Sequence, residues 1–89
     1  MTQPRRQDEL DLYAALRQAA EDYSRSHPDK PFGYWGGGSV AFRIHKELGI
    51  PEGRAFYLLI KWTGKGWIEY GMWAWGGWFT ADAPEQLEP

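Results

Sequence analysis

The sequence predicts an α+β domain in which a bundle of three helices is followed by a two-stranded β-hairpin. Apolar residues recur at the helical period of 3.6 over residues 12–23, and a Leu-Gly-Ile-Pro break at residues 48–51 separates two further helices. An aromatic, β-prone segment then leads to a Gly-Gly turn signal at residues 76–77. A short first strand is also expected near residues 32–35.

The first helix is expected over residues 8–26. Its inward stripe is Leu12, Tyr13, Leu16, Ala19, Ala20 and Tyr23. The acidic pairs Asp8/Glu9 and Glu21/Asp22 are assigned to a solvated polar face rather than to acid–base catalysis. A His-Pro pair ends the helix, because the residue before a proline is pushed out of the helical region.

Two shorter helices are expected after a run of three glycines. Ser39 is the predicted N-cap of the second helix, and Gly49 should end it in the left-handed conformation. The inward row of this helix is Val40, Ile44 and Leu48. The third helix should begin at Pro51, where a missing N–H costs no helical hydrogen bond, and run to about Thr63.

The third helix divides into two faces when its residues are projected at 100° each. Its inward face is Ala55, Leu58, Leu59 and Trp62. Its outward face is Gly53, Tyr57 and Ile60, flanked by Arg54 and Lys61 on one side and Phe56 on the other. This outward face is the candidate interaction surface.

The hairpin is expected to begin after a glycine stop at Gly66 and to hold strands near residues 67–75 and 78–80. Trp62 and Trp67 are assigned to the core, with Trp35 and Trp78 filling its edges. Trp73 and Trp75 flank the turn, and two placements stay open for them, exposure at the tip or packing onto the third helix.

The charge is unevenly distributed although the formal net charge is only −2. Residues 30–65 hold six basic and two acidic side chains, a net of +4, whereas residues 1–29 carry −2 and residues 66–89 carry −4. Net positive charge is therefore confined to the second and third helices and their surroundings. We expect the domain to span residues 8–81, with a flexible N-terminus at 1–7 and an acidic, frayed tail at 82–89.

Composition argues against several classes of site. The chain has no cysteine, which excludes disulfides and thiolate metal sites, and its two histidines are 18 positions apart. Neither a metal site, a cofactor nor a catalytic constellation is predicted, so no enzyme activity is expected. The sequence contains no apolar run long enough to span a membrane and no signal-peptide pattern, so a cytoplasmic protein without membrane association is expected.

The segment from Leu48 to Ile68 resembles the winged helix-turn-helix family. Leu48-Gly49-Ile50 and Gly66-Trp67-Ile68 stand where that family places the turn before its recognition helix and the opening of its wing. Ala55, Leu59 and Trp62 match its core positions. The resemblance covers residues 8–81 and implies a DNA-reading unit whose hairpin is the wing.

The resemblance implies a small DNA-binding protein, either a transcriptional regulator or a regulator of a phage or mobile element. In that interpretation double-stranded DNA is the partner, and Arg54, Tyr57 and Lys61 enter the major groove. The expected phosphate contacts are Ser39, Arg43, Lys46 and Lys65.

Three departures from the family pattern leave an alternative open. Pro51 stands where the family often has a capping serine, the third helix presents apolar side chains outward, and the hairpin tip lacks lysine and arginine. Such a surface is typical of protein interfaces. The alternative is a winged helix repurposed for protein–protein interaction, as a homodimer or with another protein. Its anchors would be Phe56, Tyr57, Ile60, Trp73 and Trp75.

Overall fold

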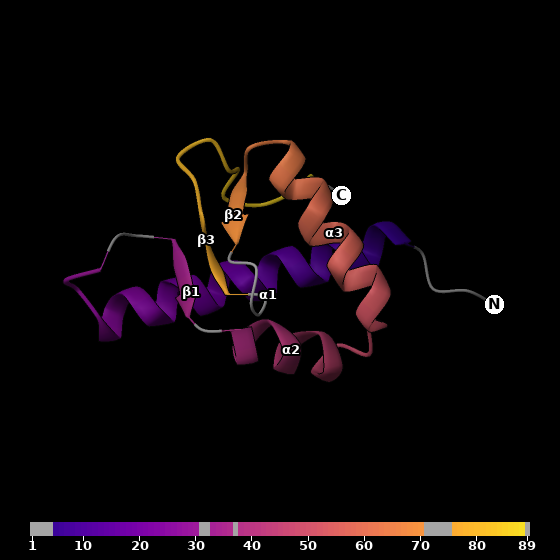
Figure 1. Cartoon of the computed structure of the whole chain (residues 1–89), viewed down its shortest axis with the longest axis horizontal. Coiled ribbons are helices and arrows are strands. Elements are labelled where there is room, and N and C mark those ends of the chain that lie inside the picture. The colour runs from indigo at the N-terminus through magenta and orange to yellow at the C-terminus, as the bar shows by residue number, and fades with distance from the viewer. Residues whose placement is uncertain (1–4, 31–32, 37, 71–75, 89) are drawn as a thin grey trace.

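The computed structural model describes residues 5–30, 33–36, 38–70 and 76–88, apart from the side chains of Arg5, Ser39 and Tyr70. The elements follow in the order α1 (Arg5–Ser26), β1 (Tyr34–Gly36), α2 (Gly38–Glu47), α3 (Glu52–Gly64), β2 (Ile68–Tyr70) and β3 (Gly77–Phe79) (Figure 1). The described part of the chain is therefore a small α+β domain of three helices and one antiparallel sheet. The predicted class and the three helices are confirmed.

The sheet has the strand order β1-β3-β2, so the last strand lies between the other two. Trp78 on β3 stands opposite Tyr34 on β1 and opposite Glu69 on β2. The predicted short first strand is confirmed at Tyr34–Gly36, and the predicted hairpin is confirmed as the β2–β3 pair. Residues 71–75, which include Trp73 and Trp75, lie outside the described residues.

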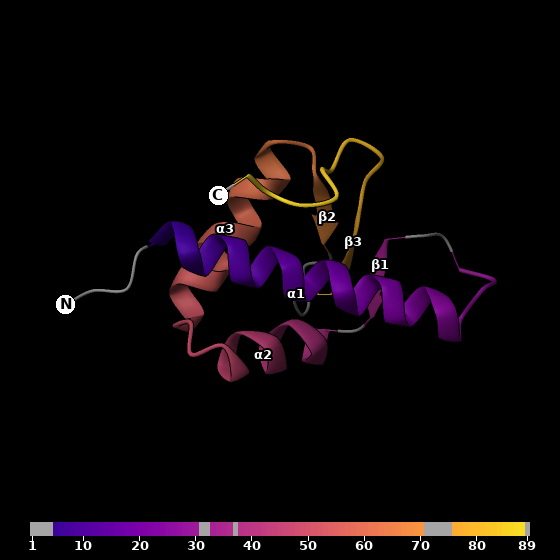
Figure 2. The same cartoon turned by 180° about the vertical axis from the view of Figure 1, so that it is seen from behind.

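The core lies between α1 and the elements that it crosses. The helix α1 runs behind the sheet and α3 in Figure 1 and in front of them in Figure 2, which is the opposite view, with α2 alongside. Tyr13 sits at the centre, with its ring 5.1 Å from Trp62 and 5.3 Å from Phe79 in edge-to-face contacts. Trp35 and Ile68 complete the buried face of the sheet. No helix among the described residues has the length and apolar character needed to cross a membrane.

Two glycine turns fix the ends of α2 and α3. Gly49 has a φ of 73°, and the N–H of Ile50 donates to the carbonyl of His45 at 2.9 Å. Gly66 repeats the arrangement after α3, with a φ of 76° and a 3.0 Å bond from Trp67 N–H to the Trp62 carbonyl. Both are Schellman motifs, which satisfy the last carbonyls of a helix. The predicted glycine stops are confirmed, and Pro51, expected as the first helical residue, is instead the N-cap of α3.

Leu48 and Trp78 were both assigned inward positions, and both assignments are wrong. Leu48 is exposed because α2 ends at Glu47, so the helical period no longer applies to it, and Ile50 takes the buried place beyond the turn. Trp78 is 42% exposed because side chains alternate along a strand. Its neighbour Phe79 faces the core, which turns Trp78 outward.

Both ends of the described chain make contacts with the rest of the domain. Residues 5–7, assigned to a flexible N-terminus, belong to α1, and Arg6 donates to the carbonyl of Glu88. The tail, expected to be frayed, lies against α1, where the Tyr13 hydroxyl donates to the Pro84 carbonyl and Leu87 packs on the core. These contacts hold the two ends of the described chain side by side (Figure 2).

Candidate interaction surface on the third helix

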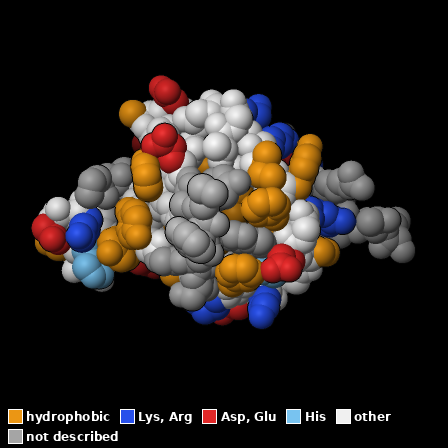
Figure 3. All heavy atoms as spheres, in the orientation of Figure 1, with side chains coloured by type: hydrophobic (Ala, Val, Ile, Leu, Met, Phe, Trp, Pro, Cys, Tyr) orange, Lys and Arg blue, Asp and Glu red, His pale blue; other side chains and the backbone are white. Residues whose placement is uncertain are grey.

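The bend at Gly49 turns α3 away from α2 and leaves one side of α3 uncovered. Its inward side chains are buried, as predicted: Ala55, Leu58, Leu59 and Trp62. On the outward side Tyr57 is 63% exposed, Ile60 47% and Phe56 39%. Figure 3 shows hydrophobic side chains gathered over α3 on the face seen in Figure 1. The expected outward face is therefore present as a set of exposed apolar side chains.

We define the α3 outer face by six of the exposed residues of α3, leaving out Thr63, together with Lys65, which directly follows the helix. These are Glu52, Gly53, Phe56, Tyr57, Ile60, Gly64 and Lys65. Gly53 and Gly64 face open space, with no neighbouring atom near the point where a Cβ would lie. The apolar side chains thus stand in the middle of the helix, with small residues toward both ends and an acid and a base at the extremities.

Arg54 and Lys61, the two cations predicted to read DNA, are both engaged with carboxylates of α1. Arg54 donates from Nη1 to Oδ2 of Asp8, and the Lys61 ammonium lies 3.0 Å from Oε1 of Glu9. The indole N–H of Trp62 donates to the other oxygen of Glu9 at 2.9 Å. These groups connect the start of α1 to α3 and neutralise charge there.

The assignment of Asp8 and Glu9 to a solvated face is wrong, since they are only 1% and 4% exposed. Burial by itself raises the pKa of Glu9, but hydrogen bonds from Trp62 and from two basic side chains outweigh it, and the pKa lies below its ordinary value of 4.5. A sequence signal exists: both acids precede Leu12 by three or four residues and so continue the inward stripe of α1.

The other predicted phosphate contacts lie around α2 and the end of α3. Arg43 is exposed and makes a 3.5 Å ion pair with Glu47 one helical turn away. Lys46 is exposed near the end of α2, and the Lys65 ammonium lies 4.8 Å from the centre of the Trp67 ring. The side chain of Ser39 lies outside the described residues, as do Trp73 and Trp75. Three of the predicted cations, Arg43, Lys46 and Lys65, are thus exposed. The other two, Arg54 and Lys61, are paired with buried carboxylates of α1.

The histidines and carboxylates form no metal-binding group within the described residues. His45 is buried, and its Nδ1 lies 2.9 Å from the carbonyl oxygen of Ile50. Because a carbonyl only accepts hydrogen bonds, this nitrogen carries the proton. His45 thereby ties α2 to the turn that precedes α3.

Comparison with known proteins gives no match of any kind: no family model, no curated protein and no solved structure is similar to the chain.

Proposed function

We propose that the chain is a protein-interaction domain of winged-helix topology that pairs through the α3 outer face, and that the partner is a second copy of the chain. The topology is supported by the order helix, strand, helix, turn, helix, hairpin, and by a sheet in which β1 joins the hairpin through β3. Since one fold hosts many functions, the function is argued from the surface of α3.

The observation that carries the proposal is the spacing of the exposed residues along α3. Gly53, Tyr57, Ile60 and Gly64 follow one another at intervals of four, three and four residues. This spacing is that of a coiled-coil seam, in which one stripe of a helix packs along another helix. The exposed apolar centre provides contact area, and the open glycines let two backbones approach closely.

The direction and identity of the partner follow from the charges at the two ends. Glu52 stands at the start of α3 and Lys65 directly after its last residue, and both side chains are exposed. An antiparallel pair related by a two-fold axis sets Glu52 opposite Lys65 of the second copy, and Tyr57 opposite its Ile60. The two helix dipoles also oppose each other in this arrangement. The surface is thus self-complementary, as a two-fold interface must be.

The same surface fits DNA less well. The exposed centre of α3 offers Phe56, Tyr57 and Ile60, which lack the bidentate groups that read base edges. Arg54 and Lys61 are held by buried carboxylates, so moving either one onto a phosphate would leave a buried charge with less compensation.

Sedimentation at protein concentrations from about 10 to 500 µM tests the proposal, because a small helical interface implies weak association. We expect a reversible monomer–dimer equilibrium, with Tyr57→Ser weakening the dimer by about tenfold or more. The matched control is Trp78→Ser, which removes an exposed aromatic from the sheet and leaves the α3 outer face intact. A strictly monomeric wild type at 500 µM, or equal weakening by both variants, would reject it.

Duplex DNA binding is a second candidate function, favoured by the exposed Arg43 and Lys46 on α2 and the exposed Lys65 after α3. If each cation neutralises one phosphate, the log–log dependence of affinity on salt has a slope of about −2.7. Anisotropy titrations with a random duplex at 50 and 200 mM salt measure it, with Lys46→Ala expected to lower the slope by about 1. No binding at about 50 mM salt, or a flat dependence, would exclude this function.

A further inference from the structure

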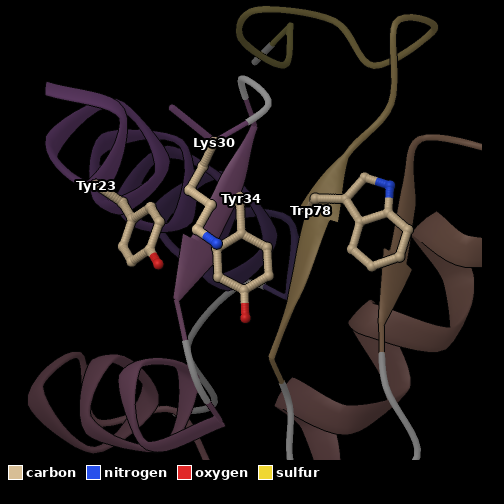
Figure 4. A pocket seen from close by; sticks show the side chains of 4 residues that line it. All are labelled: Tyr23, Lys30, Tyr34 and Trp78. Carbon is tan, nitrogen blue, oxygen red and sulfur yellow. The ribbon is translucent and has the colours of Figure 1, made fainter. Parts of the chain in front are cut away.

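A cavity opens on the outer face of the sheet, on elements distinct from the α3 outer face. It has a volume of about 390 Å³, and the described side chains that line it are Tyr23, Lys30, Tyr34 and Trp78 (Figure 4). Tyr34 and Trp78 are direct cross-strand partners on β1 and β3, Tyr23 comes from the last turns of α1, and Lys30 from the α1–β1 connection. One feature of the sequence points to this cavity. Side chains alternate along a strand, so a buried Phe79 places the neighbouring Trp78 on the outer face of the sheet.

The aromatic walls support one another. The ring centres of Tyr23 and Tyr34 are 5.0 Å apart, with their planes at 59°. Tyr23 also stacks on His27, with ring centres 4.0 Å apart and planes at 11°. Contacts with these two rings restrict Tyr23, so this end of the cavity is ordered before any ligand arrives. A preformed site loses less entropy on binding than one that must be assembled.

The polar groups of the cavity gather at one end. In Figure 4 the Lys30 side chain extends across the view toward the Tyr34 ring, on the side where Tyr23 lies, and the two phenol oxygens point the same way, while the Trp78 ring stands apart. Within the described residues no ion pair or hydrogen bond engages the Lys30 ammonium. None of the four lining side chains is a carboxylate, and Glu69, the cross-strand partner of Trp78, stands on β2, on the other side of β3 from Tyr34.

We propose that this cavity binds a small planar aromatic anion. The ring of the ligand would lie against Tyr34 and Trp78, and its anionic group would reach the Lys30 ammonium and the phenol hydroxyls, which all donate hydrogen bonds. A volume of about 390 Å³ is at the small end of ligand sites, which suits one or two fused rings with an acidic substituent. The same chemistry is offered by a free aromatic carboxylate and by a nucleoside monophosphate.

Titrations followed by ¹H–¹⁵N NMR test this assignment with three probes: indole-3-carboxylate, adenosine 5′-monophosphate and the uncharged indole-3-carboxamide. We expect saturable shifts of the Trp78 indole N–H with at least one of the two anions below about 5 mM. The anion that binds more tightly shows whether the cavity prefers an aromatic carboxylate or a nucleoside monophosphate. The carboxamide should bind about tenfold more weakly than the carboxylate, because it lacks the charge that Lys30 attracts.

Three variants separate the site from general binding. Lys30→Met keeps the side-chain stem and removes the charge, and Trp78→Leu removes the ring, so binding to that variant is followed through the backbone N–H of Tyr34; each should weaken binding by about tenfold. The matched control is Lys65→Met, since Lys65 also lies beside an aromatic ring, at 4.8 Å from Trp67, but outside the cavity. The proposal is overturned if neither anion saturates, if the carboxamide binds equally well, or if Lys30→Met and Lys65→Met behave alike.

Discussion

Asp8 and Glu9 bring two negative charges into the contact between α1 and α3. Removing a carboxylate from water is costly unless donors replace the lost hydration. Glu9 receives three hydrogen bonds, from Arg6, Lys61 and Trp62, and Asp8 receives one from Arg54. The two acids are therefore part of the fold, and the side chains that compensate them have a structural role.

Arg54→Met should destabilise the protein by about 2 kcal/mol or more. The variant leaves the buried carboxylate of Asp8 without the guanidinium that compensates it. Urea denaturation at pH 7 measures the free energy of unfolding. The control is Arg43→Met, which breaks an exposed pair and should cost no more than about 0.5 kcal/mol. Equal, small losses in both variants would show that Arg54 is a surface cation.

The lowered pKa of Glu9 predicts a loss of stability in acid. A carboxyl whose pKa is lower in the folded state stabilises the protein above its unfolded pKa, and this contribution disappears as the pH falls through the folded value. The stabilising contribution of Glu9 is therefore lost over a pH range that begins below about 4.5 and extends to lower pH. Glu9→Gln should be less stable than wild type at pH 7, and the difference should shrink between pH 4.5 and 3. Thermal unfolding across this range tests the prediction, and a constant difference would contradict it.

At the scale of elements, the order and ends of the helices depend on two glycine turns. Each turn closes a helix with a left-handed residue and then buries the apolar residue that follows, Ile50 after α2 and Trp67, in part, after α3. The turn at Gly49 sets the direction in which α3 leaves α2, and so decides which side of α3 is exposed.

Gly49→Ala should cost about 1 kcal/mol, because alanine is strained at a φ of 73° although no atom blocks its Cβ. Gly53→Ala is the contrasting variant, since Gly53 lies within α3 and also has open space around it. That change should stabilise the monomer by up to about 1 kcal/mol through helix propensity. Urea denaturation at low protein concentration measures the change in the free energy of unfolding for both variants. If both variants changed it in the same direction, the proposed need for a left-handed residue at Gly49 would be refuted.

The helices and the hairpin could be predicted because each has a local signal. Period, proline and glycine positions placed α2 and α3 to within about two residues, and they identified the outward side of α3. The pairing of Asp8 with Arg54 has no local signal, since 46 positions separate the two residues. The cavity between Tyr23 and Trp78 likewise depends on how β1 pairs with β3. Tertiary contacts of this kind are not encoded in periodicity.

At the scale of the whole molecule, the exposed surface is less positive than the distribution of charge along the sequence suggests. The net charge of +4 over residues 30–65 overstates the positive surface, because two of its six cations compensate Asp8 and Glu9. The apolar outer side of α3 and Trp78 on the outer face of the sheet both remain exposed, and Figure 3 shows hydrophobic side chains on this face of the molecule. We therefore expect association to weaken little between 50 and 500 mM salt, because apolar contact rather than exposed charge supplies most of its free energy. Sedimentation at the two salt concentrations measures this, and a tenfold loss of affinity would contradict it.

Charge exchange at the ends of α3 tests the antiparallel pairing most directly. Glu52→Lys alone and Lys65→Glu alone each place like charges opposite one another in a homodimer, whereas a mixture of the two variants restores opposite charges at both ends of the helix pair. Sedimentation of each variant and of the equimolar mixture should show weakened homodimers and a mixed dimer at least as stable as wild type. Homodimers of undiminished stability, or a mixture that associates no better than its components, would contradict pairing through the α3 outer face.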